Sequence, residues 1–123
     1  MAKKHIASPK RGDVFLVNFD PTIGAEIKKT RPALILQNNI ANTYSSVTIV
    51  AAITSCILKQ KLYPTEVFIQ KGEGGLASDS IVLLNQVRTI DKSRLTQKLG
   101  AVGSQTMFDA TKALEISVGI VEM

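Results

Sequence analysis

Few residues in this 123-residue chain are able to carry out acid–base, nucleophilic or metal chemistry. It has a single histidine, His5, and a single cysteine, Cys56. Catalytic triads and two-histidine acid–base schemes therefore find no histidine in the body of the chain. One cysteine and one histidine cannot form a structural zinc site, and no acidic cluster has the spacing of metal ligands. We therefore expect the protein to use neither a metal nor another cofactor.

Two further candidates for chemistry have simpler interpretations. The glycine-rich segment Gly72–Gly75 is similar to a phosphate-binding loop, but it lacks the Lys-Ser/Thr pair and the long helix that follow such loops. We expect a plain turn there. Cys56 is a possible nucleophile, yet no neighbour in the sequence is suited to lower its pKa. We expect it to be a small buried apolar residue.

Length and composition indicate one compact domain. Hydrophobic residues make up 45% of the chain and charged residues 20%, as in ordinary globular proteins. The longest weakly polar run, residues 47–58, is far shorter than the ~20 residues of a membrane span, so we interpret it as a buried strand. No apolar segment of a signal peptide follows the basic start, and a lone cysteine is typical of a reducing cytoplasm. The expected location is therefore the cytoplasm, with no membrane association.

The net charge of +5 is concentrated at the N-terminus. Four basic residues lie within residues 1–11, whereas the chain from Gly12 onward has eleven basic and ten acidic residues. We expect residues 1–11 to form a flexible basic arm and residues 12–123 to form the folded domain. The arm either adds a salt-sensitive attraction to phosphates or is simply solvated. Specific recognition of a nucleic acid must come from residues of the body.

The elements that position any site are mainly strands. Runs of β-branched and aromatic residues separated by turn residues predict strands at 13–19, 33–37, 47–54, 67–69, 80–84 and 87–90. Pro32 lacks a backbone donor, so the second strand is expected to begin effectively at Ala33. Residues 38–46 carry turn chemistry, and the ten-residue loop at 20–29 is long enough to be functional. Asp91 is expected to cap one helical turn through Leu95.

The last part of the chain changes to a helical period. Apolar residues recur at Met107, Ala110, Leu114, Val118 and Val121, and Ser104 is a suitable N-cap. This spacing predicts a helix over residues 105–121. Many short strands followed by one amphipathic helix predict a mainly β fold with a C-terminal helix, built on a strongly bent sheet or small barrel.

Several segments together resemble the MazF/PemK family of bacterial toxins, the endoribonucleases of type II toxin–antitoxin systems. In chain order they are RGDV at 11–14, Pro21, GAE at 24–26, TRPALILQN at 30–38, VAAIT at 50–54 and LNQVRTIDK at 84–92. Each segment alone is common, but their order and spacing are specific. With the C-terminal helix, the resemblance covers residues 11–121.

This resemblance implies an SH3-like barrel, similar to that of the CcdB toxins, and a homodimer. It also implies a metal-independent, sequence-specific endoribonuclease that cleaves single-stranded RNA such as mRNA, and so inhibits translation and growth. A cognate antitoxin is expected to occupy the RNA groove. The family's catalytic arginine and threonine correspond to Arg31 and Thr54. The sequence departs from the family at Asn85, where some relatives have an acidic residue, and at Ile27, where a polar one is common. The RNA sequence that is cut therefore cannot be inferred from the family.

The chemistry of RNA cleavage suits the two residues. Attack of a 2′-hydroxyl on its neighbouring phosphate builds charge on the phosphoryl oxygens, and the planar fork of Arg31 matches those oxygens. A guanidinium is a poor general base, so we assign Arg31 to phosphate stabilisation first and proton donation second. The hydroxyl of Thr54 can hold a phosphate oxygen or orient the nucleophile. The general base is unidentified, and Glu26 is a candidate.

Further RNA contacts are expected from Glu26, Lys28 and Lys29 in the 20–29 loop and from Asn85, Gln86 and Arg88. In an extended chain Gln86 and Arg88 share one strand face, where they are placed to read base edges or bind phosphate. Simpler interpretations exist for each: Arg31 as an ion-pair partner of Glu26, Thr54 as a β-branched strand residue, and Gln86 and Arg88 as polar groups that protect a sheet edge.

Two other functions fit the same fold. CcdB-like toxins bind gyrase without catalysis and depend on a tryptophan near the chain end, but this chain has no tryptophan and ends in GIVEM. A catalytically inactive binding module is the third possibility. We favour the endoribonuclease because Arg31 and Thr54 are both present.

Overall fold

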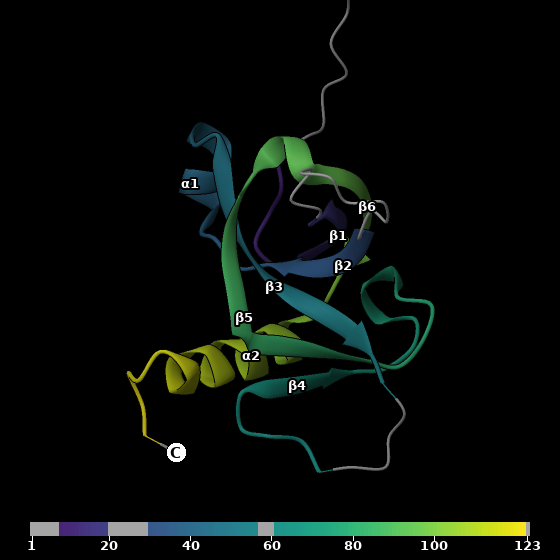
Figure 1. Ribbon diagram of the computed structural model, residues 1–123, viewed down its shortest axis with the longest axis vertical. Coiled ribbons are helices and arrows are strands. Elements are labelled where there is room, and N and C mark those ends of the chain that lie inside the picture. The colour runs from purple at the N-terminus through teal and green to yellow at the C-terminus, as the bar shows by residue number, and fades with distance from the viewer. Residues whose placement is uncertain (1–7, 20–29, 57–60, 123) are drawn as a thin grey trace, which may run out of the picture.

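Six strands and two helices make up the described part of the chain (Figure 1). The computed structural model describes residues 8–19, 30–56 and 61–122. The strands are β1 (Asp13–Asn18), β2 (Thr30–Ile35), β3 (Val47–Ser55), β4 (Glu66–Ile69), β5 (Ser80–Asp91) and β6 (Leu95–Ala101). The helices are α1 (Asn39–Tyr44) and α2 (Ser104–Ser117), and short 3₁₀ turns occur at η1 (Glu73–Gly75) and η2 (Lys92–Arg94).

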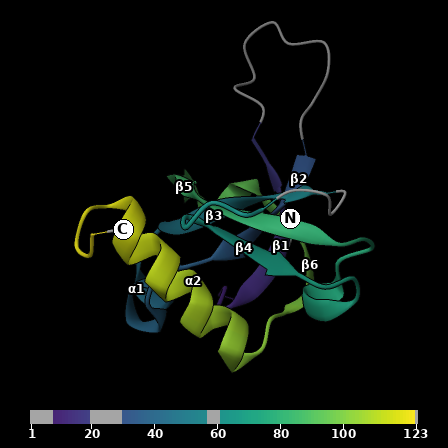
Figure 2. The same cartoon turned by 90° about the horizontal axis from the view of Figure 1, so that it is seen from below.

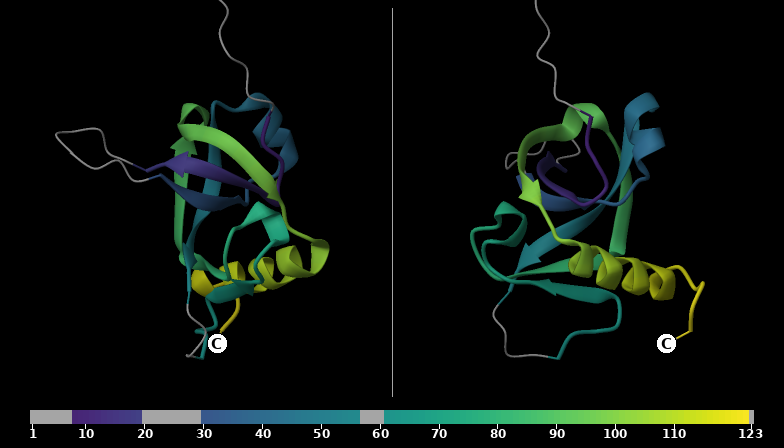
Figure 3. Two further views of the ribbon diagram at one scale, coloured as in Figure 1. Left: turned by 90° about the vertical axis from the view of Figure 1, so that its right-hand side faces the viewer. Right: turned by 180° about the vertical axis from the view of Figure 1, so that it is seen from behind.

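The strands form one antiparallel sheet in the order β4-β5-β3-β2-β1-β6. Figure 3 shows how strongly this sheet curls, with β6 running beside β1. Among the described strands, β4 and β6 are the two edges and do not pair with each other. The predicted mainly β class with a C-terminal helix is confirmed, and the sheet is barrel-like without closing into a barrel.

The core consists of two clusters on opposite faces of the bent sheet. The first includes Leu34 and Ala51 and is covered by Ala110 and Ala113 of α2, which packs against β4 and β5 (Figure 2). The second fills the other face of the sheet and contains Phe15, Val17, Ala33, Ile35, Val50, Ile90 and Leu95. Successive strand residues point to opposite faces, which is why neighbours such as Ala33 and Leu34 belong to different clusters.

β5 corrects one of the predictions. The strands expected at 80–84 and 87–90 are a single twelve-residue strand. It pairs with β3 along its length, but Ala51 lies opposite Val87 and Ala52 opposite Leu83. Three residues of β5, Leu84 to Gln86, therefore bulge out between these pairs, which breaks the period-2 alternation that the sequence pattern relies on.

Three other elements differ from the sequence-based expectation. The strand β6 was not predicted, and the expected turn region at 38–46 contains the helix α1, capped by the side chain of Asn38. β2 begins at Thr30 rather than Ala33. Pro32 has no backbone N–H to donate to a neighbouring strand. It is tolerated because registered pairs with β3 begin only at Ala33, and at Pro32 the registered neighbour of β2 is β1.

The C-terminal helix is shorter than predicted. It has Gly103 rather than Ser104 as its N-cap and ends at Ser117, so Val118 and Val121 lie beyond it and are exposed. Gly119 has a φ of 83°, and the amide of Ile120 donates to the carbonyl of Glu115. This is a glycine-terminated C-cap, in which the left-handed residue stops the helix. No helix in the described ranges is long and apolar enough to cross a membrane.

The two predicted local turns are confirmed. Asp91 accepts a hydrogen bond from the amide of Ser93 at 2.8 Å and starts the 3₁₀ turn η2; this backbone bond, followed by a side-chain bond from Ser93, lowers the pKa of its carboxyl. The glycine segment forms η1, which packs against β6. A Cβ on Gly75, whose φ is +75°, would lie 2.1 Å from the carbonyl oxygen of Leu99, so this close approach requires glycine.

The expected basic arm is only partly described. Residues 1–7 lie outside the described residues. Arg11, at the end of that arm, is bonded to the body of the protein. Its guanidinium donates to the carbonyl of Leu36 and, at 2.7 Å, to the hydroxyl of Thr111 of α2.

A buried polar network fastens α1 to the sheet. Asn42 is 1% exposed, and its side-chain oxygen accepts from Gln37 at 3.0 Å and from the hydroxyl of Thr48 at 2.8 Å. Its amide donates to the carbonyl of Gln37 at 2.9 Å, and the ammonium of Lys92 donates to its backbone carbonyl. The described residues contain no buried side-chain nitrogen or oxygen without a hydrogen-bond partner, so removal of one member of this cluster is costly.

We therefore expect Asn42→Leu to lower the free energy of unfolding by roughly 2–4 kcal/mol, since it leaves buried polar groups of Gln37 and Thr48 unpaired. Urea denaturation measures this directly. The control is Thr43→Ala, an exposed position of the same helix, which should change stability by less than about 1 kcal/mol. Equal effects of the two substitutions would contradict the role given to the network.

Candidate active site

Arg31 and Thr54 come together at the ends of β2 and β3. The last registered pair between these strands is Ala33 with Ala52. Arg31 lies two residues before Ala33 and Thr54 two residues after Ala52, so strand alternation assigns both to the sheet face that carries the second core cluster. Both residues line one hollow of about 320 Å³. The structure therefore brings together the two residues that were predicted to be catalytic.

Arg31 is exposed at the start of its strand. Among the described residues the one ion pair lies elsewhere, between Lys98 and Asp13 at 3.4 Å. The ion pair with Glu26, considered from the sequence, involves a residue outside the described part of the chain. Within the described part no carboxylate neutralises Arg31, so its guanidinium can receive an anion.

Thr54 has a hydroxyl that is only weakly engaged. The residue is half-buried, and its Oγ1 donates to the carbonyl of Ser55 at 3.4 Å, beyond the usual range for an O–H···O bond. Such a hydroxyl can turn toward a ligand in the hollow and either donate or accept.

The outer wall of this hollow is held in place by the N-terminus of α2. Leu76, Ala77, Ser78 and Ser80 line the hollow and directly follow η1. In η1, the carboxylate of Glu73 accepts from the amide of Gly103 at 3.1 Å and from the hydroxyl of Thr106 at 2.6 Å. These bonds satisfy donors at the helix start and connect η1, which precedes this wall, to α2.

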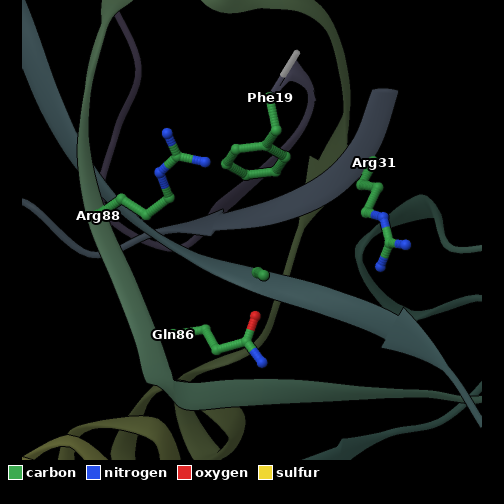
Figure 4. A pocket seen from close by; sticks show the side chains of 5 residues that line it. Phe19, Arg31, Gln86 and Arg88 are labelled. Carbon is green, nitrogen blue, oxygen red and sulfur yellow. The ribbon is translucent and has the colours of Figure 1, made fainter. Parts of the chain in front are cut away.

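A second hollow lies on the other side of Arg31. It has a volume of about 330 Å³ and is lined by Phe19, Arg31, Ala52, Gln86 and Arg88 (Figure 4). Arg31 comes from β2 and Arg88 from β5, on opposite sides of β3 in the sheet order. Arg31 lines both hollows, so they adjoin at this residue, and we call the two together the groove.

The predicted RNA contacts on β5 divide into two groups. Gln86 and Arg88 share the predicted face and line the second hollow, whereas Asn85 is exposed and lines neither hollow. β4 pairs with β5 only at Ser80–Leu83, so the half of β5 that carries these residues has β3 as its registered neighbour. Glu26, Lys28 and Lys29 lie outside the described residues.

Phe19 is a member of the groove that the sequence analysis did not single out. Its ring lies under the guanidinium of Arg88, with 5.1 Å between the guanidinium carbon and the ring centre. A signal was present in the sequence, because Phe19 continues the alternation of Phe15 and Val17 beyond the end of their strand. Phe19 is half-buried and packs partly against the second core cluster.

The described residues offer little support for other kinds of catalysis. Cys56 is half-buried rather than fully buried, and burial, with a smaller contribution from the Asp79 carboxylate, raises the pKa of its thiol. A raised pKa disfavours the thiolate, so the thiol is a poor nucleophile. In the described ranges, no group of three or more histidine, cysteine, aspartate or glutamate side chains is arranged to hold a metal ion.

Comparison with known proteins adds the family. The model of the PemK-like, MazF-like toxins of type II toxin–antitoxin systems matches residues 10–118. The chain belongs to this family. The match spans β1 through α2, and so includes the groove with Arg31 and Thr54. Membership favours the toxin endoribonucleases over the CcdB-like gyrase binders.

Individual members of the family match over nearly their whole length. Endoribonuclease EndoA of Bacillus subtilis is 44% identical over 113 residues, which cover 92% of this chain and 97% of that protein. Endoribonuclease MazF of Staphylococcus epidermidis is 45% identical over 111 residues, covering 90% and 92%. The MazE–MazF structure (Form-II) from Deinococcus radiodurans has a TM-score of 0.75 at 25% identity, covering 93% and 98%.

The weakly bonded hydroxyl of Thr54 gives a testable prediction. Thr54→Val removes this hydroxyl and keeps the β-branched shape, so we expect the RNA cleavage rate to fall roughly 10²- to 10³-fold with little change in stability. Single-turnover cleavage of an RNA and thermal unfolding measure the two quantities.

The control is Thr89→Val, because Thr89 is an exposed threonine of β5 that lines neither hollow. Its cleavage rate should stay within about twofold of the wild type. A Thr54→Val enzyme as fast as this control would show that Thr54 is only a strand residue.

Proposed function

We propose that this MazF-like endoribonuclease toxin cuts single-stranded RNA by attack of a 2′-hydroxyl on the adjacent phosphate, which is held between Arg31 and Thr54. One observation carries the proposal: these two side chains come from neighbouring strands and line the same hollow. The toxin and endoribonuclease assignment comes from the family match and from the curated relatives at about 45% identity. The chemical route and the residue roles are the proposed part.

The guanidinium of Arg31 has the properties that the reaction requires. A bond forms between O2′ and phosphorus while the bond from phosphorus to O5′ breaks, and negative charge gathers on the non-bridging oxygens. A planar, permanently charged fork of donors stabilises that charge, and a preorganised donor contributes a few kcal/mol to such transition states. The position of Arg31 between two hollows lets the RNA backbone pass on both sides of it.

The protons must move at two oxygens. One leaves the 2′-hydroxyl for a base, and one reaches the departing 5′-oxygen, giving a 2′,3′-cyclic phosphate and a 5′-hydroxyl. Thr54 holds a phosphate oxygen or orients the 2′-hydroxyl. None of the described residues that line the two hollows is a carboxylate. Glu26 therefore stays our candidate for the base, as the sequence suggested.

The remaining groove residues suit substrate binding. Arg88, with Lys28 and Lys29 of the 20–29 loop, provides positive charge for phosphates, and Gln86 offers a donor and an acceptor for a base edge. Asn85 and Glu26 complete the proposed RNA contacts. Binding through these cations should weaken as salt is added.

Partners follow from the toxin–antitoxin family. We propose a homodimer of the 12–123 domain in the cytoplasm, inhibited by a cognate antitoxin whose acidic segment occupies the same groove. Solved relatives include a MazE–MazF complex from Deinococcus radiodurans, which supports an antitoxin partner. The positive charge of Arg31 and Arg88 favours an acidic peptide for the same reason that it favours RNA.

The route predicts cleavage that needs no divalent ion. Incubation of the purified protein with a long single-stranded RNA in excess EDTA should leave the cleavage rate unchanged within about twofold, because Arg31 supplies the charge that a metal would otherwise supply. Mapping of the products should find a 5′-hydroxyl on each downstream fragment.

The control for residual contaminating nuclease is the Arg31→Ala protein, purified in the same way and inactive under the same conditions. Strict dependence on a divalent ion, or a 5′-phosphate on the downstream fragment, would rule out the proposed route.

A further inference from the structure

Phe19 has no role in the chemistry described above, yet its ring forms part of the groove. The residue directly follows β1 and packs partly against the second core cluster. It is half-buried, and the remaining part of its ring lines the hollow beside Arg31. A residue needed only for the core would not have to present its ring to the groove.

The ring contacts a neighbouring cation. The guanidinium carbon of Arg88 lies 5.1 Å from the ring centre, within the range of a cation–π contact. Arg88 is itself held in the sheet, opposite Val50 in the register of β3 and β5. Figure 4 shows the ring between Arg88 and Arg31.

The side chains around this hollow match the parts of one nucleotide. The ring of Phe19, over which the Arg88 guanidinium lies, offers its remaining exposed apolar surface to a base, and Gln86 offers an amide donor and acceptor for the edge of that base. Arg31 offers a cationic fork for the phosphate next to it. The hollow of about 330 Å³ lies at the small end of the range for ligand pockets, which suits one base rather than a duplex.

We propose that Phe19 is a stacking platform for one unpaired base adjacent to the scissile phosphate, with Gln86 reading the edge of that base. The inference rests on the proposed function, since it places the scissile phosphate at Arg31. It also explains a preference for single strands, because a base in a duplex is stacked on its neighbours and cannot lie on the ring.

The test is a double-mutant cycle in which the ring of Phe19 and single bases of an RNA are removed separately and together. The binding affinity is measured, so the result does not depend on catalysis. The probe is a short RNA of the cleaved sequence with a 2′-deoxy nucleotide at the cut position, and each nucleotide is replaced in turn by an abasic one. Phe19→Leu should weaken binding of the intact probe roughly 5- to 150-fold, the value of one base–aromatic stack. At one position adjacent to the cut, the abasic probe should lose a similar factor with the wild type and almost nothing with Phe19→Leu.

Two further proteins make the result specific. Phe108→Leu is the matched control, because Phe108 is an exposed phenylalanine that also carries a cation, with Lys112 at 5.3 Å, but lies on α2 away from the groove. It should bind every probe like the wild type. Phe19→Tyr keeps a ring and should keep the dependence on that one base.

The platform would be overturned if removal of each base weakened binding by the same factor in the wild type and in Phe19→Leu. It would also be overturned if Phe19→Tyr lost the dependence on the one base. Thermal unfolding separates this from a folding defect, since a platform predicts a melting temperature for Phe19→Leu within a few degrees of the wild type. If Phe19 and one base are coupled but cleavage requires a divalent ion, the proposed route is contradicted and the platform is still supported. If no base is coupled to Phe19 but RNA is cleaved in EDTA, only the platform is contradicted.

Discussion

The groove depends on the place where pairing between β2 and β3 stops. Registered pairs end at Ala33 and Ala52, while both strands continue and carry Arg31 and Thr54 beyond the core. Inside that limit, Ala33, Ile35 and Val50 are fully buried in the second cluster. Outside it, polar side chains such as Arg31, Thr54 and Gln86 line two hollows together with apolar residues. A rigid sheet thereby holds a cation and a hydroxyl in place before any substrate binds, which is the condition for effective electrostatic stabilisation.

The bulge in β5 determines what faces this groove. Val82, before the bulge, and Leu84, at its start, belong to the first cluster, and after the bulge Val87 packs against the same cluster. The extra residues between Leu83 and Val87 allow both ends to keep that packing while the strand stays in register with β3. Gln86 and Arg88 then reach the hollow from the other face. Bulges commonly redirect side chains beside functional sites, and here one serves the substrate side of the groove.

The sequence predicted those parts of the fold whose signals are local. The strands around Val14, Leu34 and Val50 are nearly continuous apolar runs, and Gly119 is a sequence signal for the end of α2. β6 is an edge strand with only Leu95 and Leu99 as large apolar residues, so its own sequence carries little signal for a strand. The six-residue helix α1 is made of NIANTY, and its stability comes from tertiary bonds of Asn42. Such distant partners leave no periodic pattern to detect.

The central claim is that Arg31 and Thr54 act on one phosphate, and a double-mutant cycle of the cleavage step tests it most directly. Single-turnover rate constants would be measured for the wild type, Arg31→Ala, Thr54→Val and the double variant on one RNA. If both side chains stabilise the same phosphoryl group, the double variant should be scarcely slower than the slower single variant. Losses that simply multiply would show two independent roles and would contradict the account.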